Sequence, residues 1–269
     1  MPELPEVETT RRGIEPALVG RTISGWTLRQ PRLRWPVVLP PSLRGQRIRS
    51  VVRRAKYLVV ETESGSLIVH LGMSGSLRLT SAEVAPGPHD HVDFELEGGR
   101  VLRLTDPRRF GSIHFHEGDW REHWLIKDLG IEPFDNEFDG AFLHRAARKR
   151  RVAIKQMLMD ARVVVGVGNI YANESLFRAG IRPRVSVSRI SRERYSLLAQ
   201  SVRDVLAQAI REGGTTLRDF VDESGRRGYF SHSLNVYGRE DLPCYQCGAV
   251  LKGLRIGQRA TVYCPNCQR

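Results

Sequence analysis

Residues 244–267 read CYQCGAVLKGLRIGQRATVYCPNC and contain all four cysteines of the 269-residue chain. The cysteines, Cys244, Cys247, Cys264 and Cys267, form two Cys-x2-Cys pairs separated by 16 residues. Two such pairs offer four thiolates to one tetrahedral Zn²⁺, although a redox pair or an iron–sulfur cluster also uses this spacing. We predict one structural zinc ion that clamps a β-hairpin, because a closed four-cysteine site leaves no open coordination position.

The charge of the chain favours a polyanionic partner. Lys and Arg number 42 against 30 Asp and Glu, which gives a net charge of +12. Neutralising phosphates releases condensed counterions, so such a surplus favours nucleic acid, although a solvated basic surface is the plainer alternative. Arg255 and Arg259 lie between the cysteine pairs, where a hairpin tip would reach DNA. Two acid-free runs are expected to line one groove from two sides; their members are Arg44, Arg47, Arg49, Arg53, Arg54 and Lys56, then Arg145, Arg148, Lys149, Arg150, Arg151 and Lys155.

The hydrophobic pattern before the hairpin divides into strands and then helices. Residues 3–18 predict a helix, with Pro5 in its first turn and acidic residues near the positive end of its dipole. Short strands from about residue 22 to 116 indicate a sandwich or barrel, and the clearest are 48–52, 57–61, 66–70, 76–79, 91–96 and 101–104. Helices are expected at 125–129, 140–148, 153–160, 169–179 and 192–212. A domain boundary is expected near 130–137. No stretch approaches the ~20 apolar residues that span a bilayer, and an acidic start without an apolar run predicts a cytosolic protein.

The segment 166–174, GVGNIYANE, runs from glycines directly into a predicted helix. Asn169 is expected to cap that helix, and free backbone N–H groups at such a helix start bind phosphate. A tight turn before a capped helix explains the same pattern without any ligand.

The chain start, Met1-Pro2-Glu3, carries a possible nucleophile. Removal of Met1 leaves a secondary amine at Pro2, and an α-amino group has a pKa of about 7.7–8.0, so part of it is neutral near pH 7. Such an amine forms a charged iminium directly when it attacks a sugar C1′, and Glu3 beside it can move protons. Met-Pro-Glu is a common start, so the motif alone decides nothing.

Taken together, these motifs identify a family. The chain resembles bacterial formamidopyrimidine-DNA glycosylase, also called 8-oxoguanine DNA glycosylase, over essentially its full length. The match is loosest at 31–46 and 184–194. The matching motifs, in order, are PELPEVE at 2–8, RRAKY at 53–57, HLGMSG at 70–75, TDPRRFG at 105–111, and GVGNIYANE at 166–174 with the cysteine hairpin.

The resemblance implies an α+β fold in three parts. Residues 1–130 would form an N-terminal helix with a β-sandwich, 131–238 a helical DNA-binding domain with a helix–two-turn–helix motif, and 239–269 the zinc ribbon. It further implies a monomeric, cytoplasmic base-excision repair enzyme. The enzyme would excise oxidised purines from duplex DNA through a Schiff base and nick the abasic site by β,δ-elimination.

The resemblance also implies roles for individual residues. Pro2 would be the nucleophile and Glu3 the acid/base, while Lys56 would assist β-elimination and Arg259 would assist δ-elimination. Residues 215–230 would form a loop that closes over the damaged base. The gap left by a flipped nucleotide would be filled by Met73, Arg108 and Phe110, and further DNA contacts would come from His89, Arg150 and Asn169. Core packing is the alternative for Met73 and Phe110, but the glycines beside them favour exposed turns.

Two other functions fit part of this pattern. A sister class with the same chemistry acts on oxidised pyrimidines, but Leu4 and the pair Arg108 and Phe110 favour the purine class. A non-catalytic zinc-ribbon DNA-binding protein would share the charge and the cysteines, yet it would not need a free Pro2 beside Glu3.

Overall fold

The structure is a computed structural model that describes residues 2–215 and 233–269. The chain divides into two compact units. The first consists of Met1–Lys127 with Glu212–Ser231, and the second consists of Asp128–Arg211 with His232–Arg269. Each unit is therefore assembled from two separate stretches of the sequence.

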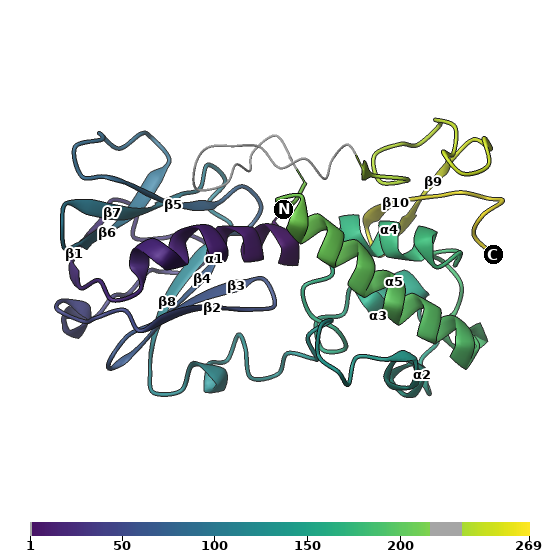
Figure 1. Ribbon diagram of the computed structural model, residues 1–269, viewed down its shortest axis with the longest axis horizontal. Coiled ribbons are helices and arrows are strands. Elements are labelled where there is room, and N and C mark those ends of the chain that lie inside the picture. The colour runs from purple at the N-terminus through teal and green to yellow at the C-terminus, as the bar shows by residue number, and fades with distance from the viewer. Residues whose placement is uncertain (1, 216–232) are drawn as a thin grey trace. The chain divides into compact units, whose positions relative to one another are not determined.

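The first unit is a β-sandwich of two four-stranded antiparallel sheets (Figure 1). One sheet has the strand order β1-β6-β7-β5 and the other the order β2-β3-β4-β8. The strands are β1 (Ile23–Leu28), β2 (Ser50–Arg54), β3 (Tyr57–Glu61), β4 (Gly65–His70), β5 (Ser76–Ser81), β6 (Asp90–Leu96), β7 (Arg100–Thr105) and β8 (Ser112–Glu117). Short 3-10 turns lie at Pro41–Leu43 and Trp120–Glu122.

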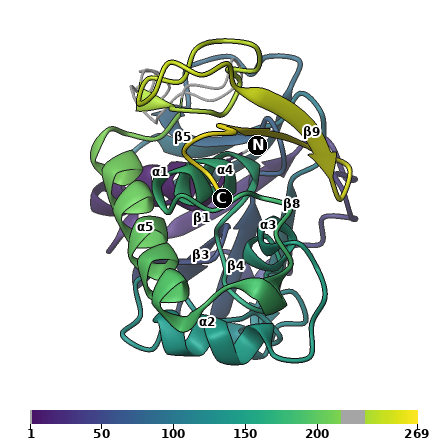
Figure 2. The same ribbon diagram turned by 90° about the vertical axis from the view of Figure 1, so that its right-hand side faces the viewer.

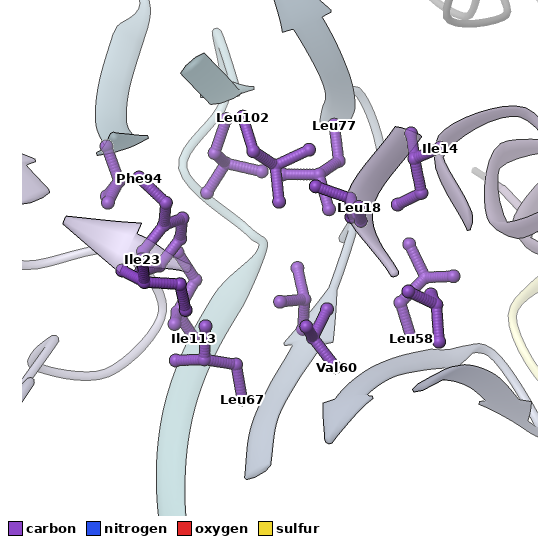
Figure 3. Close-up of a cluster of buried hydrophobic side chains, with 14 of the residues drawn as sticks. Ile14, Leu18, Ile23, Leu58, Val60, Leu67, Leu77, Phe94, Leu102 and Ile113 are labelled. Atoms are coloured by element: carbon purple, nitrogen blue, oxygen red, sulfur yellow. The ribbon is translucent and has the colours of Figure 1, made fainter. Parts of the chain in front are cut away.

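Helix α1 (Leu4–Leu18) shares the core of this sandwich. Its apolar face contributes Val7, Ile14 and Leu18, all fully buried, as the spacing along a helix requires. Figure 3 shows Ile14 and Leu18 among the side chains of the cluster, together with Phe94 and other residues from both sheets. Burial of this face fixes α1, and with it the chain start, against the sandwich.

The second unit combines helices with a two-stranded hairpin. Its elements are α2 (Gly140–Ala147), α3 (Ile154–Leu158), α4 (Asn169–Arg178), a 3-10 turn (Val187–Arg189), α5 (Arg192–Arg211), β9 (Lys252–Ile256) and β10 (Arg259–Tyr263). Helix α5 lies beside α2 in Figure 2, and a Cβ on Gly140 would meet the Ser196 nitrogen at 2.4 Å. Glycine at this position therefore allows the two helices to approach closely.

The zinc-ribbon segment shares a small hydrophobic cluster with neighbouring parts of its unit. Leu251 and Val262 of the ribbon pack with Phe177 from α4 and with Val236. The hairpin is thus supported by the helical part of its unit as well as by its cysteines.

The predicted elements overlap the observed ones, with bounds that differ by up to two residues, except at three places. The helix expected at 125–129 is absent, because the N–H groups of Ile126 and Lys127 both bond to the carbonyl of His123 in a turn that does not continue. Strands β1 and β8 were not among the individual strands predicted, although both lie in the region assigned to strands.

None of the helices in the described part of the chain is long and apolar enough to cross a bilayer.

Candidate active site and zinc centre

The four cysteines lie together, as their spacing predicted. Their sulfur atoms all lie within 4.8 Å of one another. Cys244 and Cys267 are separated by 4.0 Å between sulfurs, and Cys247 and Cys264 by 3.5 Å. Zinc–sulfur bonds of 2.3 Å at tetrahedral angles require about 3.8 Å between sulfurs. Four thiolates at this separation make the site of one structural zinc ion.

The tip of the hairpin presents arginine. The turn between β9 and β10 uses Gly257 at φ 53° and Gln258 at φ 63°, as in the two-residue turns that match strand twist. Arg255 and Arg259 are exposed beside it. Both arginines are therefore exposed at the hairpin tip, and their contact with DNA remains a prediction.

The second strand of the hairpin is fastened to α3 and α4 directly after Arg259. Lys155 is fully buried, and its Nζ donates to the carbonyl oxygen of Ala260 at 2.9 Å and to Oγ1 of Thr261 at 2.7 Å. Asn173 accepts a 3.1 Å hydrogen bond from the backbone N–H of Val262. Lys155 was expected in a surface run of basic residues, but it is a buried anchor for the strand that begins at Arg259.

Asn169 does not cap its helix, which corrects the prediction. The N-cap of α4 is Gly168, and no side chain caps it. Asn169 is the first helical residue, and its Nδ2 donates to the carbonyl oxygen of Ala260 at 3.1 Å. Its Oδ1 is buried and has no hydrogen-bond partner among the described residues. Asn169 therefore helps to attach the hairpin to helix α4.

The chain start is organised around the buried carboxylate of Glu6. Its Oε2 accepts a 2.8 Å hydrogen bond from the backbone N–H of Glu3 at the start of α1. Its Oε1 accepts from both the N–H and the hydroxyl of Thr215, at 2.9 and 3.0 Å. Glu6 thus holds Glu3 and Thr215 together. Beyond Thr215, the predicted closing loop at 215–230 lies outside the described residues.

Lys56 lies in the two-residue turn between β2 and β3, close to His70. Burial, and then the charges of Lys56 and Arg34, lower the pKa of His70 to about 4. The ring is therefore neutral at pH 7, and its Nδ1 accepts the N–H of Gly72 at 3.0 Å, so the proton is on Nε2. His70 lies in the segment HLGMSG at 70–75, but nothing in the sequence marks it as a site residue. Only its position beside Lys56 in the fold reveals it.

The turns that carry Met73 and Phe110 are packed backbone against backbone. A Cβ on Gly72 would lie 2.4 Å from the nitrogen of Gly111, so only glycine fits there. The Arg108 guanidinium lies 5.0 Å from the ring centre of Phe110, which is 45% exposed. Met73 is half-buried. The expectation of an exposed turn holds for Phe110, and the structure brings together Met73, Arg108 and Phe110.

Two further predicted contact residues lie at the surface of their own units. His89 is exposed in the first unit. In the second unit, Arg150 pairs with Asp160 at 3.2 Å between Nη1 and Oδ2, and its side chain remains 39% exposed. Burial alone would raise the pKa of Asp160, but its hydrogen bonds with Arg162 and Arg150 outweigh burial and lower it. The carboxylate therefore stays ionised and orients Arg150.

The predicted site residues fall in both units. Pro2, Glu3, Lys56, Met73, His89, Arg108 and Phe110 lie in the first unit, whereas Arg150, Asn169, Arg259 and the cysteines lie in the second. The groove expected between the two basic runs remains a prediction.

The fold and the cysteine centre define the class of protein: a β-sandwich joined to a helix–two-turn–helix domain and a zinc ribbon. Family models match in the same order. The formamidopyrimidine-DNA glycosylase N-terminal domain matches residues 1–113, its H2TH domain 129–221, and the zinc finger found in FPG and IleRS 241–269.

Similar proteins match along the whole chain. A formamidopyrimidine-DNA glycosylase from Alkalilimnicola ehrlichii is 58% identical, and one from Syntrophotalea carbinolica 54%, each covering 100% of both chains. The crystal structure of MutM (Fpg) from Thermus thermophilus has a TM-score of 0.88 at 38% identity, covering 99% and 98% of the two chains. Lactococcus lactis Fpg, in a complex with abasic-site DNA, has a TM-score of 0.92 at 33% identity and 99% coverage of both. The chain belongs to the formamidopyrimidine-DNA glycosylase family of DNA glycosylases with abasic-site lyase activity.

Proposed function

We propose that this chain excises oxidised purines, such as 8-oxoguanine and formamidopyrimidines, from duplex DNA and then nicks the abasic site. The single observation that carries the proposal is family membership along the full chain, with relatives solved on Fapy-dG DNA and on abasic-site DNA. The net charge of +12 suits a DNA substrate. The enzyme acts in the cytoplasm as a monomer.

Pro2 is the proposed nucleophile once Met1 has been removed. While Met1 is attached, the Pro2 nitrogen belongs to a tertiary amide and has no lone pair available for attack. The freed amine forms a bond from nitrogen to C1′, and the glycosidic bond to the base breaks. Glu3, 2% exposed at the start of α1, is suited to exchange protons with the opened sugar and the Schiff base.

Strand cleavage follows from the Schiff base by two eliminations. In the first, a proton leaves C2′ and the bond to the 3′ phosphate oxygen breaks. In the second, a proton leaves C4′ and the C5′–O bond breaks, so that the 5′ phosphate leaves with the electron pair of that bond. Lys56, in its turn beside neutral His70, is proposed to bind the phosphate at the lesion and assist the first elimination. Arg259 on the hairpin tip is proposed to assist the second.

The lesion base must leave the duplex stack before Pro2 can reach C1′. Apolar wedges offset the stacking that is lost, and we assign this role to Met73 and Phe110, with Arg108 reading the orphaned cytosine. Their turns are joined by hydrogen bonds to Asp106, which suits a rigid wedge. Further DNA contacts are assigned to His89, Arg150 and Asn169.

The three expected parts serve different steps in this proposal. Residues 1–130 carry the nucleophile and the wedge, 131–238 grip the DNA, and 239–269 present Arg259 on a zinc-held hairpin. Zinc stabilises this ribbon and takes no part in the chemistry, because four cysteines fill its coordination.

The substrate class is tested by base release. The processed protein should release 8-oxoguanine opposite cytosine much faster than it releases thymine glycol from the same duplex. A preference for thymine glycol would instead assign the chain to oxidised pyrimidines. Binding without release of either base would indicate a non-catalytic DNA-binding protein.

A further inference from the structure

The turn that carries Lys56 contains a strained residue. Ala55 has a φ of 56°, in the left-handed region, where the Cβ of a non-glycine residue is crowded against the following carbonyl oxygen. Glycine, asparagine or aspartate usually takes such a position in a two-residue turn. Ala55 is only 3% exposed. Strain of this kind persists where the surroundings hold it in place, so the contacts of Ala55 show what holds Lys56.

The side chain of Arg53 holds this turn in place through hydrogen bonds. Its Nη1 donates a 3.0 Å hydrogen bond to the carbonyl oxygen of Ala55, and its Nε donates a 3.3 Å hydrogen bond to Oε2 of Glu8. The side chains of Arg53 and Glu8 are 11% and 12% exposed, so water competes weakly for these bonds. A planar guanidinium bridges two acceptors in a fixed geometry that a lysine ammonium cannot reproduce.

Glu8 is a residue of helix α1, so the hydrogen bond from Arg53 to Glu8 ties the turn to that helix. Burial would raise the pKa of Glu8, but hydrogen bonds from Arg11 and Arg12, and then the charges of Arg11 and Arg53, outweigh burial and lower it. The carboxylate therefore stays ionised at neutral pH. Arg11 also donates to the carbonyl oxygen of Val51 at 3.3 Å, which fastens the helix to strand β2.

We propose that Glu8 and Arg53 form a positioning relay that fixes the Ala55–Lys56 turn relative to α1. The helix that begins directly after Pro2 and Glu3 thereby also sets the direction of Lys56. Neither relay residue touches DNA in this account, so both are positioning residues. The inference rests on the proposed role of Lys56 in nicking.

The test compares Arg53→Lys, Lys56→Gln and the double variant. The readout is the single-turnover nicking rate on abasic-site duplex at saturating enzyme, with DNA affinity measured separately. Arg53→Lys should lose roughly tenfold to a hundredfold in rate, since a misplacement of about 1 Å can cost up to about a hundredfold. In the Lys56→Gln background the same change should cause no further loss. Arg121→Gln is the matched control, because Arg121 lies in the same unit, is 65% exposed and pairs with Asp119 instead of Glu8.

Each result of this experiment either supports or overturns the proposed relay. Losses that multiply in the double variant, or an Arg53→Lys variant as fast as wild type, would overturn the relay while leaving the role of Lys56 intact. A Lys56→Gln variant that nicks normally would overturn that role and the relay together. Thermal unfolding checks the folding of each variant. If Arg53→Lys does not fold, Glu8→Gln replaces it in the same cycle, with the same expected dependence on Lys56.

Discussion

The hydroxyl of Ser74 donates a 2.9 Å hydrogen bond to Oδ1 of Asp106, a carboxylate with no exposed surface. The other oxygen of Asp106 accepts the backbone N–H of Gly111 at 2.8 Å. One buried carboxylate thus holds together the two turns that carry Met73 and Phe110. These turns lie far apart in the sequence, so the proposed wedge depends on this contact.

Replacing Asp106 with Asn should weaken the wedge. The substitution replaces one carboxylate oxygen by an NH₂ group, so one buried donor loses its acceptor. This costs about 1–3 kcal/mol of folding stability. Tm should fall by roughly 2–4 °C for each kcal/mol in a chain of this size. Release of 8-oxoguanine from duplex DNA should fall more than nicking of a ready-made abasic site. Asp119→Asn, at a side chain 52% exposed, is the control and should leave both activities unchanged.

Lys155→Met should displace Arg259. The substitution removes the donors that the carbonyl oxygen of Ala260 and the hydroxyl of Thr261 use, at a cost of about 1–3 kcal/mol. We expect lower Tm and products shifted from β,δ-elimination toward β-elimination alone on a sequencing gel. Lys149→Met, at an exposed lysine of the same basic run, tests whether loss of charge alone has this effect. An unchanged product ratio in Lys155→Met would contradict the anchoring role.

Cys264→Ser should cost the protein its zinc ion. A structural zinc site contributes directly to folding, so the ribbon should unfold and DNA affinity should drop, whereas the β-sandwich unit stays folded. Metal analysis should find one zinc per wild-type chain and much less in the variant. Val250→Ser, at a residue 56% exposed in the same segment, serves as the matched control. Normal binding of damaged duplex by a zinc-free preparation would rule out this role.

Stability should fall as the pH is lowered from about 6.5 to about 4, because of two buried histidines. Burial lowers the pKa of His70 to about 4, and burial with the charges of His114 and His116 does the same for His123. The unfolded chain gains protons near pH 6.5 while these folded rings stay neutral, so acid favours unfolding and the stability is fully present only above about pH 6.5. Urea unfolding of His123→Gln should show a smaller loss over this interval than wild type. An equal loss in both proteins would exclude His123 as a cause.

Much of this molecule was predictable because local chemistry decides it. Cysteine spacing predicted the zinc site, and alternation with turn residues predicted the strand Tyr57–Glu61 at its observed bounds. Helix α1 follows from Pro5, the acidic first turn and the spacing of its apolar residues. In each case the signal lies within a few residues of the feature.

The errors concern residues whose environment is set by distant parts of the chain. Lys155 belonged to a basic run, yet a strand more than a hundred residues later buries it and supplies its acceptors. Asn169 had the position of a cap, but the same strand attracts its amide. His70 gains its lowered pKa from burial and from Lys56 and Arg34, which only the fold brings near.

The central claim is that Pro2 attacks C1′ as the first residue of the processed chain, and covalent trapping tests it most directly. The processed protein should be mixed with duplex DNA that carries 8-oxoguanine opposite cytosine, in the presence of borohydride. The matched control is the same protein with its Pro2 nitrogen blocked by an N-terminal extension. Mass spectrometry of the processed protein should find a cross-link on Pro2, and the blocked protein should give none. A cross-link on a lysine, or no trapped complex with fully processed protein, would contradict the account.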